Sequence, residues 1–250
     1  MSLDLTPLDK YAGAAVEFFW GTRVDAAMRQ QETGKTDQGE RGGVTAGHNM
    51  DGFMMLLAEL AAANGLSNAD IHTGASVVTL PGYFRPTKRW DLVMIAGNRL
   101  VAAIELKSQV GPSFGNNFNN RAEEAIGAAQ DFWTAYREGA FGDGPRPFLG
   151  WLMLVEDCAK SRAPGQRLDA PHFDVFPEFV RASYLARYDL LCRKLMLESL
   201  YTHAALVTAQ RDSTQVGQYG EFSAPTSLRS FAVAVAAHVA AVVASGYERG

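Results

Sequence analysis

The sequence predicts an α/β fold in which helices flank a central mixed β-sheet. Segments with apolar residues at helical spacing alternate along the chain with short apolar segments rich in β-branched residues, as happens when helices and strands interleave. Two of the short segments are separated only by Gly97-Asn98-Arg99, which is a hairpin signal. The sheet should therefore contain at least one antiparallel pair.

In the N-terminal part we expect two helices joined by a loop. Residues 8–28 and 49–63 carry apolar side chains at helical spacing, and Asn64-Gly65 follows the second segment as a typical helix stop. Between them, residues 32–48 alternate glycines with charged side chains. This segment has no apolar face to bury, so it is predicted to be a loop that orders around a ligand.

Strands and helices interleave in the rest of the chain. The strand pattern occurs at residues 76–80, 90–96, 100–106, 148–155 and 204–209. The helical pattern occurs at residues 121–138, 177–202 and 227–244. Residues 108–120 are polar and are predicted to form a loop.

The composition is that of an ordinary globular protein. The chain has 250 residues, 47% hydrophobic and 20% charged, and no linker or repeat divides it. We expect one domain over residues 1–250, with a flexible loop at about 32–48, a core at about 49–155 and a C-terminal helical and strand part at 177–245. Two cysteines without CxxC or ligand-spaced histidines exclude a zinc or disulfide framework.

Neither export nor membrane insertion is expected. The first ten residues include acids and lack a hydrophobic signal segment. The apolar stretch at residues 231–244 is shorter than the roughly 20 residues of a membrane span, and His238 interrupts it. We therefore predict a cytoplasmic protein with no membrane partner.

The charge distribution permits a phosphate-bearing partner. The net charge is −4, but between residues 85 and 121 six basic residues face only two acids, giving a local +4: Arg85, Lys88, Arg89, Arg99, Lys107 and Arg121 against Asp91 and Glu105. Phosphate contacts depend on where charge lies rather than on its average.

The residues that carry chemistry are Asp91 and, fourteen positions later, Glu105 and Lys107. Glu105 and Lys107 are two apart on a predicted strand, so both project from one face. The opposite face should pack against the core and carry Leu100, Ala102, Ile104 and Leu106.

Whether Asp91 joins Glu105 depends on the register of the hairpin. A two-residue turn at Gly97-Asn98 places Asp91 opposite Ile104, on the wrong face. A three-residue loop over residues 97–99, or a bulge with the same effect, places Asp91 directly across from Glu105. We predict the second arrangement. The two carboxylates could then share Mg²⁺, with the Leu106 carbonyl as a further ligand and Lys107 beside the reacting phosphate.

The alternative is that Glu105 and Lys107 lie on a solvated sheet face, where such pairs are common. The surrounding segments are apolar enough to look central and buried, and a buried charge needs a partner or a metal. Both charged positions also fall at strand ends, where side chains can reach a cleft.

These residues resemble the PD-(D/E)xK nuclease superfamily. More narrowly, residues 36–39, 49–52, 105–121 and 133–139 resemble the XhoI-type type II restriction endonucleases, most strongly from 89 to 138. The sequence departs from the motif in one respect, because Trp90 replaces the proline that usually precedes the first acid.

The resemblance implies a restriction-endonuclease-like core over residues 49–155. It implies that Asp91 and Glu105 bind magnesium and that Lys107 is the motif lysine. It further implies a prokaryotic homodimer that cuts both strands of 5′-CTCGAG, leaving 5′ overhangs, beside a DNA methyltransferase that protects the host. A repair or junction-resolving nuclease of the same superfamily and a non-cleaving DNA-binding protein are the alternatives.

Three segments are candidates for contacting double-stranded DNA. The first is the cluster Gln109, Asn116, Asn117, Asn119, Asn120 and Arg121, since asparagine can pair with adenine and arginine with guanine. Asn119 or Asn120 could instead cap a helix that starts at Arg121. The second is the glycine-rich loop with Lys35, Gln38, Arg41 and His48, and residues 211–221 are the third.

Asp51 has two interpretations. It lies near the start of the second predicted helix, where it could supply an outer carboxylate to the metal. It could equally be a first-turn acid favoured by the helix dipole.

Overall fold

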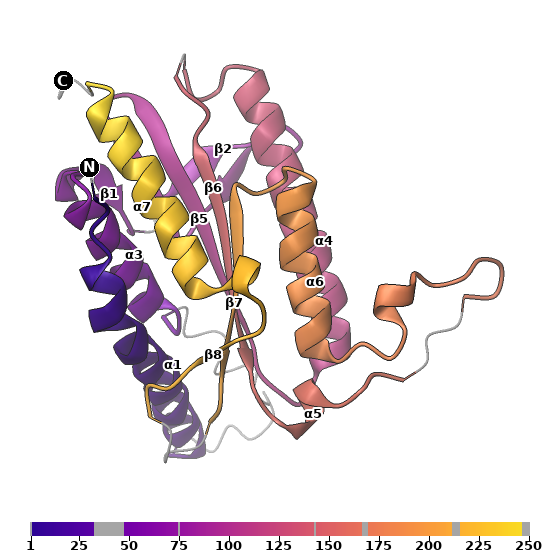
Figure 1. Ribbon diagram of the computed structural model, residues 1–250. Helices are drawn as coiled ribbons and strands as arrows, with labels where there is room; N and C mark the ends of the chain where they lie inside the picture. The colour runs from indigo at the N-terminus through magenta and orange to yellow at the C-terminus, as the bar shows by residue number, and fades with distance from the viewer. Residues whose placement is uncertain are drawn as a thin grey trace.

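A six-stranded mixed sheet forms the centre of the molecule, in the order β1-β4-β5-β6-β7-β8 (Figure 1). The computed structural model describes residues 2–32, 48–74, 76–142, 144–166, 170–211 and 216–246. The strands are β1 (Ile71–His72), β4 (Leu92–Ala96), β5 (Arg99–Gln109), β6 (Phe148–Glu156), β7 (His203–Ala209) and β8 (Gly220–Glu221). The pairs β5-β6 and β6-β7 are parallel, and the other three pairs are antiparallel. The predicted fold class is confirmed.

Helices cover both faces of this sheet (Figure 1). One face carries the helices α1 (Thr6–Glu32), α3 (Asp51–Ala63) and α7 (Leu228–Ala244). The other face carries the helices α4 (Phe114–Arg137) and α6 (Tyr184–Leu197). Short elements complete the described chain: α5 (Ala159–Arg162), η2 (Asn68–Asp70), η3 (Pro177–Phe179), η5 (Ala224–Thr226) and a separate antiparallel hairpin of β2 (Thr79–Pro81) and β3 (Thr87–Arg89). None of the described helices combines the length and apolarity needed to cross a membrane.

The two N-terminal helices form as predicted. In α3 the side chains of Phe53, Leu56 and Leu60 are fully buried, and Gly65 ends the helix in a left-handed conformation at φ 101°. Helix α1 crosses α3 at Gly52, where an added Cβ would lie 2.8 Å from the Cα of Ala15. The absence of a side chain there is what lets the two backbones approach.

Three predicted boundaries are wrong. Of the expected strand 76–80, only residues 79 and 80 lie in a strand, which is β2 (Thr79–Pro81). The expected helix 177–202 is broken, because Arg181 adopts φ 57° and Ser183 then caps α6 by accepting a hydrogen bond from the Ala186 N–H at 3.2 Å. The expected loop 108–120 is mostly regular, because β5 continues to Gln109 and α4 begins at Phe114. Phe114 and Phe118, one helical turn apart, are both buried and draw the asparagine-rich segment into α4.

The β4-β5 hairpin contains a bulge. Next to the turn, Ala96 pairs with Arg99, so Gly97-Asn98 is a two-residue turn. Farther along, Leu92 pairs with Ile104, which shifts the register by one residue. Val101 is the inserted residue. The bulge that we predicted as one route to the required register is thus confirmed. It also moves Leu100 into the cluster beneath α4 and α6, away from Ala102, Ile104 and Leu106, so our placement of Leu100 is wrong.

Candidate active site

Asp91, Glu105 and Lys107 lie on the face of the sheet that α4 and α6 cover. Val93 and Ala103 pair with each other and belong to the cluster on this face. Asp91 is two residues before Val93, and Glu105 is two residues after Ala103. Since side chains two apart on a strand share a face, the bulge register sets Asp91 across from Glu105.

Two lysines enclose the carboxylate of Glu105, which is 6% exposed. The ammonium nitrogen of Lys88 lies 2.5 Å from Oε2, and that of Lys107 contacts Oε1. Burial acts to raise the pKa of Glu105, but the two lysines outweigh it and lower the pKa below its ordinary value. Glu105 is therefore a buried, ionised carboxylate.

Asp91 is in the opposite electrostatic situation. Its Oδ2 accepts a hydrogen bond from the Leu106 N–H at 2.7 Å. Burial and the neighbouring charge of Glu105 raise the pKa of Asp91, and this outweighs the opposing effects of Lys107, the Leu106 N–H and Lys88. Two carboxylates that share one site have thus been pushed apart in pKa.

Lys88 is the site residue that sequence reasoning missed. It comes from β3, and its ammonium lies 4.5 Å from the centre of the Trp90 ring as well as beside Glu105. We counted Lys88 only as part of a basic segment, because the β2-β3 hairpin was not predicted. The turn residues Pro81-Gly82 and Pro86 are the signal from which that hairpin could have been found.

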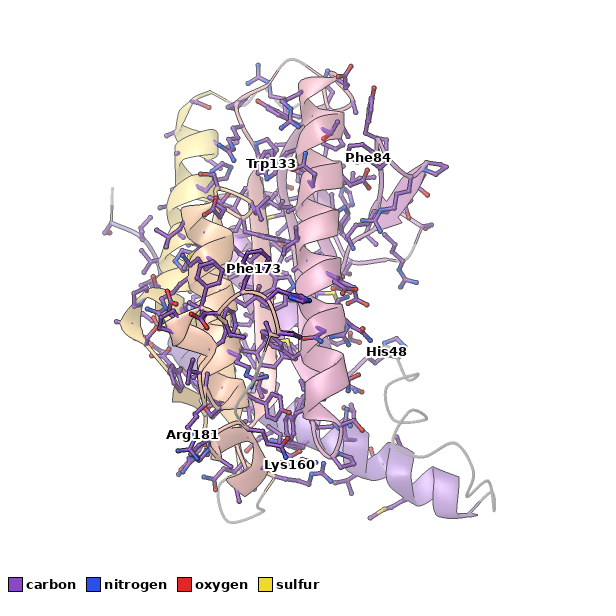
Figure 2. All side chains as sticks on the ribbon, turned by 90° about the vertical axis from the view of Figure 1, so that its right-hand side faces the viewer. His48, Phe84, Trp133, Lys160, Phe173 and Arg181 are labelled. Atoms are coloured by element: carbon purple, nitrogen blue, oxygen red, sulfur yellow. The ribbon has the colours of Figure 1, made fainter. Side chains whose placement is uncertain are left out.

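Asp131 on α4 holds the β2-β3 hairpin in place. Its carboxylate accepts hydrogen bonds from the N–H groups of Tyr83 and Phe84 at 2.7 and 2.8 Å and from Nε of Arg85 at 2.7 Å. Burial opposes these bonds, but together they lower the pKa of Asp131. Gly82 is needed here, since an added Cβ would lie 2.6 Å from both Arg85 O and Asp131 Oδ2. Figure 2 shows Phe84 at the hairpin tip beside α4.

A basic cleft of about 350 Å³ opens over Glu105. Its charged lining consists of Arg85, Lys88, Arg89, Lys107 and Arg121 against Glu105 and Glu124, and Ala125, Ala128, Trp151 and Tyr201 complete it. Asp91 is not among the residues that line the cleft. Five cations against two acids make this cleft suitable for a phosphodiester.

The predicted DNA-contacting cluster is divided by the structure. Arg121 lines the cleft, pairs with Glu124 at 2.5 Å and has a buried Nε without a hydrogen-bond partner among the described residues. Asn119 and Asn120 are exposed on α4; they do not cap it, because the helix starts at Phe114. Asn117 donates to Ser113 O at 2.7 Å. The side chain of Asn116 is outside the described part of the chain.

Gln109 has a local structural contact. It is 4% exposed, and its amide donates to Val110 O at 2.8 Å and to Ser113 O at 3.3 Å. This placement favours a role in holding the turn between β5 and α4.

The remaining predicted residues lie elsewhere. Asp51 begins α3, on the other side of the sheet, and pairs with His48 Nδ1 at 2.8 Å. Lys35, Gln38 and Arg41 lie outside the described residues. Among the residues that the structure describes, no group of three or more His, Cys, Asp or Glu side chains is gathered as a metal cage. A hard cation here would have to share two carboxylates with water and substrate.

A mixed sheet with helices on both faces, an acid before one hairpin strand and a Glu-x-Lys on the next is the arrangement of a restriction-endonuclease-like nuclease. The family model for restriction endonuclease XhoI matches residues 29–221. The chain belongs to this family. No solved structure is significantly similar to it.

Curated bacterial relatives agree with this assignment. The chain is 54% identical over 199 residues to "Type II restriction enzyme XhoI" of Xanthomonas vasicola, covering 79% of each chain. It is 59% identical over 174 residues to "Type II restriction enzyme AbrI" of Azospirillum brasilense, covering 69% of this chain and 77% of the relative. It is 47% identical over 218 residues to "Type II restriction enzyme BstVI" of Geobacillus stearothermophilus, covering 85% and 96%. The chain is therefore a type II restriction enzyme, a site-specific deoxyribonuclease.

Proposed function

We propose that this enzyme cleaves both strands of duplex DNA at 5′-CTCGAG or a close variant, requires magnesium and leaves 5′ overhangs. The observation that supports this most directly is the pair of carboxylates, half-buried Asp91 and buried Glu105, which the bulge register sets across from each other beside Lys107, with a basic cleft over Glu105. The palindrome and the overhang come from the family resemblance. All of this machinery would belong to one domain over residues 1–250.

The donor set fits magnesium. Asp91 and Glu105 supply carboxylate oxygens from adjacent strands, which is the ligand type that Mg²⁺ prefers. The backbone carbonyl of Leu106 is a third candidate ligand. The Leu106 N–H donates to Asp91, and the N–H and C=O of one strand residue point toward the same neighbouring strand. The carbonyl is therefore directed to the side of β5 on which Asp91 lies. Asp51 is a weaker candidate, because α3 packs on the opposite face and its carboxylate is paired with His48.

The chain's own residues would then orient the reaction. Magnesium bound between the carboxylates would supply a polarised phosphate and an acidified water. Lys107 is placed to hold the attacking water or to neutralise charge that develops on the phosphate. Arg121 and the other cleft cations would fix the DNA backbone, since an arginine fork matches phosphate geometry.

Sequence readout is proposed for residues on two elements. Asn119 and Asn120 project from α4 near Arg121 and could reach base edges, with Asn116 and Asn117 in the first turn of the same helix. Gln109 could reach a base only by giving up its contacts in the turn. The segment with Lys35, Gln38, Arg41 and His48 is the second candidate. A palindromic site matches a homodimer, and we infer that the enzyme is cytoplasmic and that a DNA methyltransferase protects the same site in its prokaryotic host.

Digestion of a plasmid with a single CTCGAG site tests the proposal. With Mg²⁺ we expect one linear product whose recessed 3′ ends a polymerase can fill in, and with EDTA we expect no cleavage. A plasmid with one base of the site changed is the control. Light scattering should give twice the chain mass of 27.1 kDa. Nicking without site preference would contradict the proposal and would indicate a nuclease that recognises DNA shape.

A further inference from the structure

Each oxygen of the Glu105 carboxylate already has a cationic partner, and the two partners come from different elements. Lys107 is on β5 itself and contacts Oε1. Lys88 is on the separate β2-β3 hairpin and contacts Oε2 at 2.5 Å. Lys88 is 13% exposed, so this contact is only partly accessible to water. A cation that binds Glu105 competes with these two ammonium groups, because each lies against an oxygen that the cation would use and like charges repel.

Lys88 is the lysine that can leave. Lys107 is two residues from Glu105 on one strand, so its backbone keeps it beside the carboxylate. Lys88 has other partners that would remain when it moves: the Trp90 ring at 4.5 Å and the Arg89 carbonyl at 3.2 Å. An aromatic face and a carbonyl can both hold an ammonium group. Lys88 also lines the basic cleft, so a short movement would bring its charge to a bound phosphate.

The metal-free enzyme needs such a cation. Glu105 is 6% exposed and ion-paired with both lysines, and a buried carboxylate without a counter-charge is strongly unfavourable. The hairpin that carries Lys88 is fixed by three hydrogen bonds to Asp131, which sets the position from which Lys88 reaches Glu105.

We propose that Lys88 is a placeholder cation: it neutralises Glu105 before the metal binds, competes with the metal for Oε2, and is displaced into the cleft when the metal arrives. This inference rests on the proposed magnesium-dependent function. It gives the active centre two lysines with different tasks, because Lys107 stays at the carboxylate whereas Lys88 exchanges with the metal.

Metal binding to the full-length protein, without DNA, tests the proposal. Mn²⁺, which also takes carboxylate ligands, is titrated and its free fraction is followed by electron paramagnetic resonance. Lys88→Met should lower the Mn²⁺ Kd by about threefold or more, since removing the competitor frees an oxygen of Glu105. Lys88→Arg, which keeps the charge, should bind no more tightly than the unmodified enzyme.

Two further variants separate the possible failures. Arg89→Met removes a cation from the same cleft, so it measures only the effect of one less positive charge near the metal site. It should lower the Mn²⁺ Kd by less than about twofold. Asp91→Asn should lose most Mn²⁺ binding. If Asp91→Asn binds as well as the unmodified enzyme, the proposed metal site itself is wrong. If Asp91→Asn loses binding but Lys88→Met binds no tighter, only the placeholder role is wrong.

Thermal melting gives a second readout. In EDTA, Lys88→Met should melt about 2–6 °C lower than the unmodified enzyme, and saturating Mg²⁺ should raise its melting temperature more than that of the unmodified enzyme. An equal or smaller metal-induced rise would overturn the proposal.

If Lys88→Met does not fold, the unmodified Lys88 can be followed through Trp90. A metal-induced fluorescence change that is present in the unmodified enzyme and missing in Trp90→Phe supports displacement of Lys88 from Glu105. An identical metal response in both proteins counts against it.

Discussion

The two faces of strand β5 have opposite characters. On the face covered by α1, α3 and α7, the strand presents Ala102, Ile104 and Leu106 to an apolar cluster. On the face covered by α4 and α6, the same stretch of strand presents Glu105 and Lys107. One face contributes stability through apolar burial, whereas the other holds charges whose desolvation is costly. The difference indicates that, in this stretch of β5, one face serves packing alone, whereas the other carries the charged site at the apolar cluster beneath α4 and α6.

The largest expected effects are losses of cleavage on replacing either carboxylate. The two replacements should change the stability of the metal-free protein in opposite directions. Asp91→Asn and Glu105→Gln should each lower cleavage about 10³-fold or more, the rate equivalent of the several kcal/mol that metal polarisation supplies. Glu105→Gln should also destabilise the metal-free protein, because the two partly buried ammonium groups of Lys88 and Lys107 lose their counter-charge. Asp91→Asn should stabilise it at neutral pH by about 1 kcal/mol, seen as a melting temperature about 2–4 °C higher in EDTA.

The sign of the Asp91 effect follows from its raised pKa. A group whose folded pKa is raised contributes stability that is full below its unfolded pKa and is lost as pH rises through the folded pKa. At neutral pH the unmodified protein has lost this contribution, and asparagine does not titrate. Melting temperatures measured from pH 4 to pH 8 should therefore converge at the acidic end. A constant difference across that range would contradict the explanation.

The next effect concerns Asp131, which holds the β2-β3 hairpin in place on the charged face. Asp131→Ala removes the carboxylate that accepts three hydrogen bonds, from the N–H groups of Tyr83 and Phe84 and from Nε of Arg85. We expect a loss of about 2–4 kcal/mol in unfolding free energy and about a tenfold loss of cleavage, because the hairpin that positions Lys88 becomes free to move. Denaturant unfolding and plasmid cleavage measure both. Glu123→Ala, an exposed acid on the same helix, should change neither.

A matched pair of glycines tests the apolar face. Gly52→Ala places a Cβ 2.8 Å from the Cα of Ala15 and should cost about 1–3 kcal/mol by forcing α1 and α3 apart. Gly127→Ala on α4, where an added Cβ meets nothing within 4 Å, should instead stabilise by about 0.5–1 kcal/mol. Cleavage per folded molecule should be unchanged in both. A loss of specific activity in Gly52→Ala would show that the two faces are coupled.

The sequence was sufficient to predict the fold class and the facing acids, because both depend on local pattern. Alternation along residues 100–106 and the position of the hairpin turn limited the register to two values, and chemistry favoured one of them. Lys88 could not be placed in this way. It reaches Glu105 only because Asp131, far along the chain, fixes a hairpin whose strands are three residues each. Such short strands carry almost no periodic signal.

The asparagine-rich segment was misread for a related reason. Asn119 and Asn120 have low helix propensity, and composition alone predicted a loop. The buried pair Phe114 and Phe118 outweighed that preference, because tertiary packing supplies most of the stability of a helix in a protein. The distance between those two phenylalanines, one helical turn, was the usable signal.

The smallest expected effect concerns His238, which joins the apolar face to the bulge. Its Nε2 lies 3.1 Å from the carbonyl oxygen of Val101. That residue is the one inserted into β5. Because a carbonyl only accepts, Nε2 carries the proton and donates. The bond satisfies a carbonyl at the bulge that sets Asp91 across from Glu105.

Burial lowers the pKa of His238, although the bond to Val101 opposes this shift. A buried neutral histidine gives full stability above its unfolded pKa of about 6.5, and this stability is lost as pH falls through the folded pKa. His238→Gln keeps an amide donor and does not titrate, so its unfolding free energy should fall less between pH 7 and pH 5 than that of the unmodified protein. His203, whose pKa is also lowered by burial, titrates in both proteins and cancels from the difference.

His238→Leu lacks the donor, so it should be less stable than His238→Gln at pH 7 by about 1 kcal/mol, the usual value of one hydrogen bond. Equal stability of the two variants would mean that the Val101 carbonyl does not need this donor.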